Sequence, residues 1–232
     1  SKFKKNIDLI GFHGQTIFHD PNNKITKQLG DGKLLSQLTK KIVVYNFRQK
    51  DLESGGQGAP LTPIFHNLLS NNIYSKYKNN FSNILNLGGI SNITKTVKGN
   101  GFSLKDIEAF DIGPGNCLID EWLRKNSNKR FDESGFIGKS GTVNQLILNQ
   151  AIENFNIISY DKSLDIKDFD ISFAKGLSLE DGCATITNFT AYLISEGLKF
   201  LNKKNNQTSN RYLICGGGRK NNFLIETIKK YL

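Results

Sequence analysis

The sequence contains little methionine, proline or cysteine and no long apolar run, which argues against several classes of protein. It has no methionine, four prolines and three cysteines among 232 residues. Cys117, Cys183 and Cys215 are far apart and form no CxxC pair, which argues against a disulfide scaffold and for a reducing compartment. No run of about 18 apolar residues is present, so we expect no membrane segment. The basic residues 1–5 lack the apolar stretch of a secretory signal, and we expect a cytoplasmic protein.

A metal site and a nucleic-acid interface are not favoured either. His13 and His19 are six residues apart, which fits no known zinc spacing. The formal net charge is +10, but the lysines occur in scattered pairs, not in one stripe with interleaved aromatics. We therefore predict no metal-ligating residues and no nucleic-acid partner, although a basic surface suits an anionic small molecule.

The sequence begins and ends within runs that resemble secondary-structure elements. A strand-like run at 7–10 follows almost at once after residue 1, which is not methionine, and a helix-like run at 223–232 continues to the last residue. We expect a fragment of a longer polypeptide, truncated at both ends.

Strand-like runs that lead into glycine-rich turns recur along the chain. They lie in 42–69, 83–97, 107–124 and 211–232, and a helix follows in three of them. Strands alternating with helices predict an α/β fold, in which glycines at the carboxyl ends of strands commonly bind ligands. Four such turns favour a nucleotide or phosphate cleft over ordinary turns. A Walker A loop is absent, and Leu118 stands where a dinucleotide fingerprint needs a small residue.

The remaining pattern predicts further elements. We expect strands at 7–12, 42–47, 83–86, 90–97, 107–110 and 211–215, a loop at 11–16, helices at 33–41, 62–69, 117–124, 143–154 and 183–201 and from 221 onward, and polar connections at 125–142 and 202–210.

Asp111 is the candidate general base. It stands at the expected end of a strand, directly before a glycine turn and a helix, where a carboxylate can take a proton or hold Mg²⁺. The alternative is a helix cap, but Asn116 is closer to the start of the helix and fits that position better.

A second group of candidates lies near the amino terminus. His13, Gln15 and Thr16 are neutral hydrogen-bonding residues suited to the hydroxyl and amide groups of a sugar. A hydrogen-bonded turn is the alternative. Arg48 follows a strand and could pair with a carboxylate or phosphate, or simply lie on the surface.

Several motifs together resemble the anhydro-N-acetylmuramic acid kinase family. They are IGFHGQTIFHDP at 10–21, NFRQKDLESGGQGAPLTPIFH at 46–66, NLGGISNIT at 86–94, FDIGPGNCLIDEW at 110–122, KSLDIKDF at 162–169, EDGCATITNFTA at 180–191 and ICGGGRKN at 214–221. The resemblance covers nearly the whole chain in order. It implies an actin-like, ribonuclease H-like fold with two lobes and ATP between them, here residues 1–80 with sugar-binding loops and 81–232 with nucleotide motifs.

The resemblance also implies an activity. Water opens the 1,6-anhydro ring of anhydro-N-acetylmuramic acid while O6 takes the γ-phosphoryl group of ATP, with Mg²⁺, to give N-acetylmuramic acid 6-phosphate in peptidoglycan recycling. A homodimer is also implied. Alternatives are another actin-fold sugar kinase or a non-catalytic nucleotide-binding relative.

The resemblance also implies roles for individual residues at positions that match the family motifs. Asp111 matches the catalytic aspartate, while His13, Gln15, Thr16 and Arg48 match the sugar pocket. The expected nucleotide-binding residues are Gly88, Gly89, Gly113, Gly115 and Asn116 near the phosphates and Gly216, Gly217 and Gly218 against adenosine.

Two positions depart from the family pattern. Asn46 replaces an expected aspartate and Phe12 an expected small residue. The phosphate-binding hairpin of the family would precede residue 1, and a helical segment carrying a glutamate would follow residue 232. We therefore expect weak or no turnover from residues 1–232 alone.

Overall fold

The computed structural model describes residues 6–77, 83–96, 107–155, 160, 163–204 and 211–232. The chain forms two compact units, Ser1–Leu61 and Thr62–Leu232. This division precedes the predicted boundary at residue 80, because the helix after Leu61 packs with the second unit. The assignment of 1–80 and 81–232 as functional lobes stays a prediction.

The first unit combines two small sheets with two helices. Strands β1 (Leu9–Gly11) and β4 (Ile42–Val44) are parallel, and β2 (Gln15–Asp20) and β3 (Ile25–Leu29) form an antiparallel hairpin. Helix α1 is Gly32–Thr39 and α2 is Phe47–Glu53. Asp31 caps α1 by accepting hydrogen bonds from the backbone N–H groups of Lys33 and Leu34.

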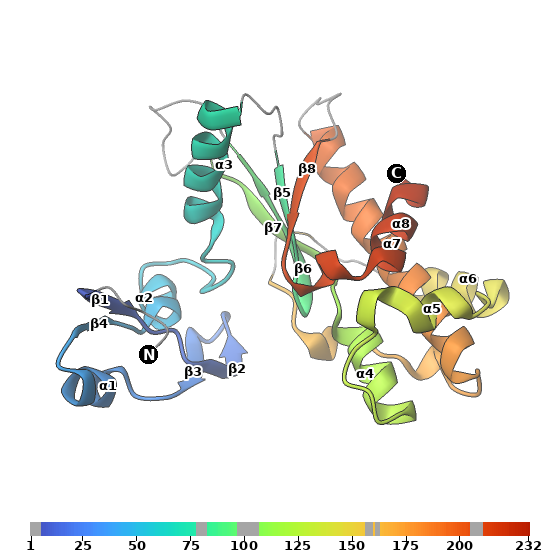
Figure 1. The fold of residues 1–232 in the computed structure, drawn as a ribbon, viewed down its shortest axis with the longest axis horizontal. Coiled ribbons are helices and arrows are strands. Elements are labelled where there is room, and N and C mark those ends of the chain that lie inside the picture. The colour runs from blue at the N-terminus through green and yellow to red at the C-terminus, as the bar shows by residue number, and fades with distance from the viewer. Residues whose placement is uncertain (1–5, 78–82, 97–106, 156–159, 161–162, 205–210) are drawn as a thin grey trace. The chain divides into compact units, whose positions relative to one another are not determined.

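The second unit is built on a mixed sheet. Its strands are β5 (Asn83–Leu87), β6 (Ile90–Lys95), β7 (Ala109–Pro114) and β8 (Tyr212–Cys215), in the spatial order β7-β6-β5-β8. The first three are antiparallel neighbours, and β8 runs parallel to β5 (Figure 1). The predicted α/β class is confirmed, and this sheet is of the kind expected in an actin-like lobe.

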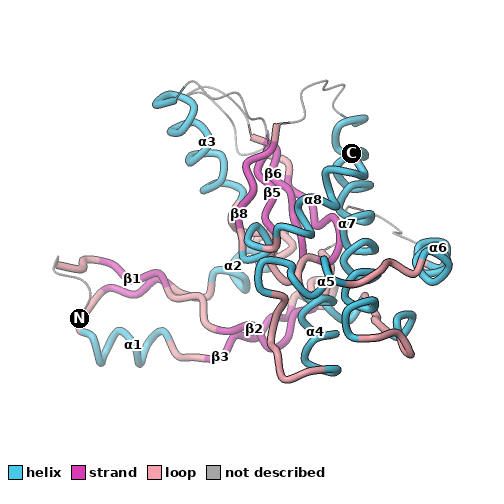
Figure 2. Tube along the Cα trace, turned by 45° about the vertical axis from the view of Figure 1, so that its right-hand side comes forward, coloured by secondary structure: helices cyan, strands magenta, loops and turns pink. Residues whose placement is uncertain are grey.

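Helices lie on both faces of this sheet (Figures 1 and 2). On one face packs α7 (Leu179–Lys204), and Leu85, Ile93 and Ile112 join the core there. Helices α4 (Cys117–Asn126) and α8 (Asn222–Tyr231) pack against α7. On the other face lies α3 (Pro63–Tyr77), which His66 joins to β6 through a 2.8 Å hydrogen bond between Nδ1 and Thr94 Oγ1. The remaining elements are η2 (Glu133–Gly135), α5 (Phe136–Ser140), α6 (Gln145–Asn154), η3 (Ile166–Asp168), η4 (Ser172–Ala174) and η5 (Gly217–Lys220).

Some expected elements were wrong. Residues 11–16 are not one loop, because Gln15 and Thr16 belong to β2. Phe47 begins α2 and does not end a strand. Strand β7 continues through Asp111 to Pro114, since the β6 partner strand extends alongside it. Residues 125–142 contain η2 and α5, and α7 continues to Lys204, while 205–210 lie outside the described residues.

Among the helices that the structure describes, none is long and apolar enough to cross a membrane.

Candidate active site

Asp111 lies within β7, on an almost fully buried strand. Its side chain is 8% exposed, and its Oδ2 accepts a 2.9 Å hydrogen bond from the backbone N–H of Leu164. This bond limits rotation of the carboxylate. A buried, oriented carboxylate can act as a general base when a substrate excludes water.

Two asparagines share the sheet face of Asp111. In the strand register, Asn92 of β6 lies opposite Asp111, and Asn86 of β5 lies opposite Asn92. Residues directly opposed in an antiparallel pair point to the same face with Cβ atoms about 5 Å apart. Asn86 Oδ1 in turn accepts a weak hydrogen bond from Cys215 Sγ on β8, at 3.6 Å. A polar row therefore crosses the sheet.

Sequence reasoning missed both asparagines. The available signal was the alternation within NILNL and ISNITK, which places Asn86 on one face with Ile84, and Asn92 on one face with Ile90 and Thr94.

The glycine turns that follow β5 and β7 are joined by backbone hydrogen bonds. The N–H groups of Gly115 and Asn116 donate to the carbonyl oxygens of Gly89 and Gly88, at 2.8 and 2.7 Å. Cys117 N–H donates to Gly89 at 3.3 Å. A Cβ on Gly115 would overlap the Gly88 carbonyl, so this close approach requires glycine. These three N–H groups therefore already have protein acceptors.

Of the other residues predicted to bind the nucleotide, Gly113 lies against a helix, whereas Asn116 and Gly218 lie against each other. Gly113 faces α7, because a Cβ there would meet Leu193 Cβ at 3.3 Å. Asn116 occupies the predicted cap position of α4, but its side chain makes no cap hydrogen bond. Instead, a Cβ on Gly218 would lie 2.6 Å from Asn116 Oδ1, so the CGGG segment packs against this amide.

A cavity of about 440 Å³ opens at this contact. Its lining includes Asn116, Gly217 and Gly218, together with Asp120 and Asp132. Burial, and secondarily the negative charge of Asp132, raise the pKa of Asp120 to about 6, against the opposing effect of Arg124. Carboxylates favour hydrogen-bond donors over phosphate groups at this position.

The first unit brings His13 and Arg48 into direct contact. Arg48 Nε donates to His13 Nε2 at 2.9 Å, and His13 Nδ1 lies 2.7 Å from the Gly14 carbonyl oxygen. The bonds are consistent with a neutral imidazole that carries its proton on Nδ1. The two predicted residues thus form one unit, although 35 residues separate them in the sequence.

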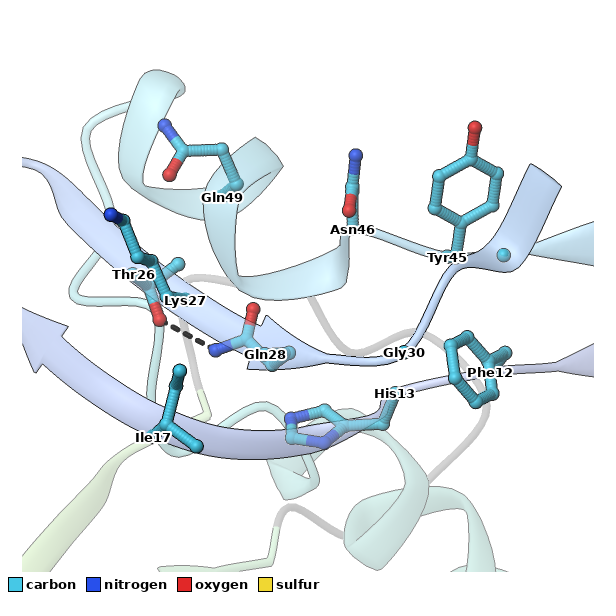
Figure 3. Close-up of a pocket in the computed structure, with 11 residues that line it drawn as sticks. Phe12, His13, Ile17, Thr26, Lys27, Gln28, Gly30, Tyr45, Asn46 and Gln49 are labelled. Carbon is cyan, nitrogen blue, oxygen red and sulfur yellow. Dashed lines mark hydrogen bonds between the residues drawn. The ribbon is translucent and has the colours of Figure 1, made fainter. Parts of the chain in front are cut away.

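A cavity of about 410 Å³ lies beside His13 (Figure 3). Phe12, Tyr45 and Asn46 also line it. The Phe12 ring packs on Gly30, where a Cβ would overlap it. Both positions that depart from the family pattern, 12 and 46, therefore face this cavity.

Gln15 and Thr16 are not among the residues lining that cavity. Gln15 is exposed, and Thr16 Oγ1 accepts a long, 3.4 Å hydrogen bond from Gln28. Their role as sugar ligands stays a prediction.

The described residues contain no group of three or more His, Cys, Asp or Glu side chains placed to hold a metal ion. A single carboxylate at Asp111 fits Mg²⁺ only as an ion held mainly by phosphates and water, which is its usual mode with nucleotides.

Comparison with known proteins gives one consistent result. A family model described as anhydro-N-acetylmuramic acid kinase matches residues 2–232. The chain is 52% identical over 97% of its length to the protein of that name from Pelagibacter ubique. The corresponding identities are 39% over 97% for Methylobacterium nodulans and 41% over 93% for Zymomonas mobilis. The chain spans 59%, 58% and 56% of the lengths of these three relatives.

Proposed function

Because the chain belongs to the anhydro-N-acetylmuramic acid kinase family, we propose that the protein is an ATP-dependent sugar kinase of cell-wall recycling. Its substrate is anhydro-N-acetylmuramic acid. Water opens the 1,6-anhydro ring, and O6 receives the γ-phosphoryl group of ATP. The observation that carries this proposal is the buried, oriented carboxylate of Asp111 beside the joined glycine turns.

Asp111 is the general base in this proposal. Its carboxylate takes a proton from the water that attacks the anomeric carbon, and the departing O6 then attacks the γ-phosphorus. The hydrogen bond from Leu164 N–H occupies Oδ2 and fixes the plane of the carboxylate before the substrate binds. Such preorganisation avoids reorientation during the reaction.

The cavity beside Asn116 and Gly217–Gly218 is the proposed nucleoside site. Its glycines leave room for a flat base, and the carboxylate of Asp120 can accept hydrogen bonds from hydroxyl or amino groups. Mg²⁺ bound to the phosphates would supply positive charge to the transferring phosphoryl group.

Arg48 is the proposed ligand of the sugar's lactyl carboxylate, and His13 positions the Arg48 guanidinium group. The guanidinium group is held through Nε by His13, so its remaining N–H groups keep a fixed direction. Arginine binds carboxylates through parallel N–H groups, which a lysine could not reproduce.

The test is an ADP-release assay on the full-length protein with anhydro-N-acetylmuramic acid, ATP and Mg²⁺. Asp111→Asn keeps the shape of the side chain but removes the base, and we expect kcat to fall by roughly 10³-fold or more. Asp8→Asn, a change at an exposed carboxylate, is the matched control and should be neutral.

Turnover of other sugars but not of the anhydro sugar would move the assignment to a different kinase substrate. Full activity of Asp111→Asn would refute its role as the base.

A further inference from the structure

Asn92 occupies the position nearest to Asp111 on the neighbouring strand. The two residues are direct partners in the β6–β7 register, and β5, β6 and β7 lie side by side (Figure 1). The next residue, Ile93, points to the opposite face and is fully buried in the core against the helices. Asn92 therefore has no freedom to leave the face of Asp111 without shifting the strand by one residue.

The amide oxygen of Asn92 is unusual. Oδ1 is buried, and no residue that the structure describes donates a hydrogen bond to it. Leaving a buried acceptor unsatisfied costs about 1–3 kcal/mol, and such groups are rare in native proteins. An apolar side chain would suit the folded protein better at this position. We therefore expect the hydrogen-bond donor for this oxygen to be part of the bound substrates.

The proposed ring opening requires a second acceptor at this place. The attacking water has two O–H groups, and Asp111 takes the proton from one of them. The other O–H must point away from the anomeric carbon, so that the lone pair faces that carbon. We propose that Asn92 Oδ1 accepts this second O–H and thereby orients the water; this inference rests on the proposed function.

The chemistry of an amide suits that task. Water oxygen forms a bond to the anomeric carbon as the bond from that carbon to O6 breaks. One proton passes to Asp111, and the O6 electron pair attacks the γ-phosphorus as ADP leaves. The second proton stays on oxygen as the new anomeric hydroxyl. An amide oxygen accepts a hydrogen bond but does not remove the proton, whereas a second carboxylate would compete with Asp111 for it.

The experiment compares Asn92→Leu with Asn92→Ser in the full-length protein. Leucine has a similar size and no acceptor, while serine keeps an oxygen. The measurements are kcat and KM with the anhydro sugar, ADP affinity by calorimetry, the Mg²⁺ dependence of kcat, and the thermal unfolding midpoint. Asn149→Ala, on the exposed side of α6, is the control.

We expect Asn92→Leu to lower kcat about 10²-fold, the usual range for loss of a group that assists proton transfer. ADP affinity should stay within about twofold and the unfolding midpoint should not fall, because the amide oxygen makes no bond in the protein itself. Asn92→Ser should recover about tenfold of the lost rate.

Three results would overturn the proposal. They are an unchanged kcat, a lower unfolding midpoint with lost ADP binding, or an increased Mg²⁺ requirement, which would make Asn92 a metal ligand. Failure of the proposed function can be told apart from these results, because the wild-type protein itself would then not turn over the anhydro sugar. In that case the proposed role of Asn92 would also be wrong.

Discussion

At the scale of single residues, the site contains carboxylates in different environments. Asp111 receives a backbone hydrogen bond, whereas Asp120 lies in the proposed nucleoside cavity, where burial raises its pKa to about 6. The orientation of Asp111 suits proton transfer at a fixed position. Asp120 changes its charge near pH 6, so its effect on stability can be measured by varying the pH.

Asp120 should lower stability at neutral pH. Its folded-state pKa is raised from 3.8 to about 6, so its stabilising contribution is complete below about pH 4 and is lost as pH rises through 6. In the absence of nucleotide, Asp120→Asn should therefore raise the free energy of unfolding at pH 7.5 by roughly 1–2 kcal/mol, after discounting for partial exposure. The gain should shrink towards zero at pH 4. Urea unfolding at both pH values measures it.

Asp170 is a control for which the change to asparagine should alter stability in the opposite direction. Hydrogen bonds from Ser172 lower its pKa, so its ionised form is favoured by the fold. Asp170→Asn should reduce stability at pH 7.5, and this loss should become smaller as pH falls below 3.8 and through the lowered pKa. If the two variants shifted stability in the same direction, the electrostatic explanation for Asp120 would fail.

At the scale of elements, glycines set how closely the helices approach one another. A Cβ on Gly182 of α7 would overlap the indole ring of Trp122, whose Nε1–H donates to the Leu179 carbonyl oxygen at 2.9 Å. A Cβ on Gly197 would lie 2.5 Å from Ile112 Cβ. Helix α7 therefore packs closely against α4 at one point and against β7 at another.

Gly182→Ala tests this packing. Alanine is favoured over glycine inside a helix by about 1 kcal/mol, so helix propensity alone predicts stabilisation. The overlap with Trp122 predicts instead a net loss of roughly 1–3 kcal/mol. Gly11→Ala, where an added Cβ meets no atom within 4 Å, is the comparison and should show no steric loss. Chemical denaturation followed by far-ultraviolet circular dichroism, which reports on both units, gives both values.

The sequence predicted the elements with regular periodicity and missed those without it. The strands of 83–97 and the helices of 117–124 and 183–201 have clear apolar patterns, and the structure has them. The β2–β3 hairpin was missed because a bulge between Thr16 and Phe18 breaks the alternation of its residues. Asn92 and Asp111 come together only through strand register, which no local pattern encodes.

At the scale of the whole molecule, the two units differ in their interiors. Of the described hydrophobic side chains, Leu52 is the one fully buried in Ser1–Leu61, whereas the second unit buries a continuous core. Exposed apolar residues of the first unit include Leu9, Leu38 and Ile42. Buried apolar area is the main stabilising contribution to a fold, so the second unit is the more stable one.

Limited proteolysis of residues 1–232 should follow this difference. We expect cleavage within the first unit at protease concentrations that leave a resistant fragment beginning near Thr62, because local opening is easiest where few apolar contacts are lost. Mass spectrometry of the fragments locates the cuts. Equal rates of loss from both units would show that they unfold together.

The backbone bonds between Gly88–Gly89 and residues 115–117 have a consequence for how such sequences diverge. An inserted or deleted residue in either turn would leave three N–H groups without their acceptors. A change of length in one turn is therefore tolerated only with a matching change in the other. Although more than twenty positions separate them in the sequence, the two turns should therefore change in length together or not at all.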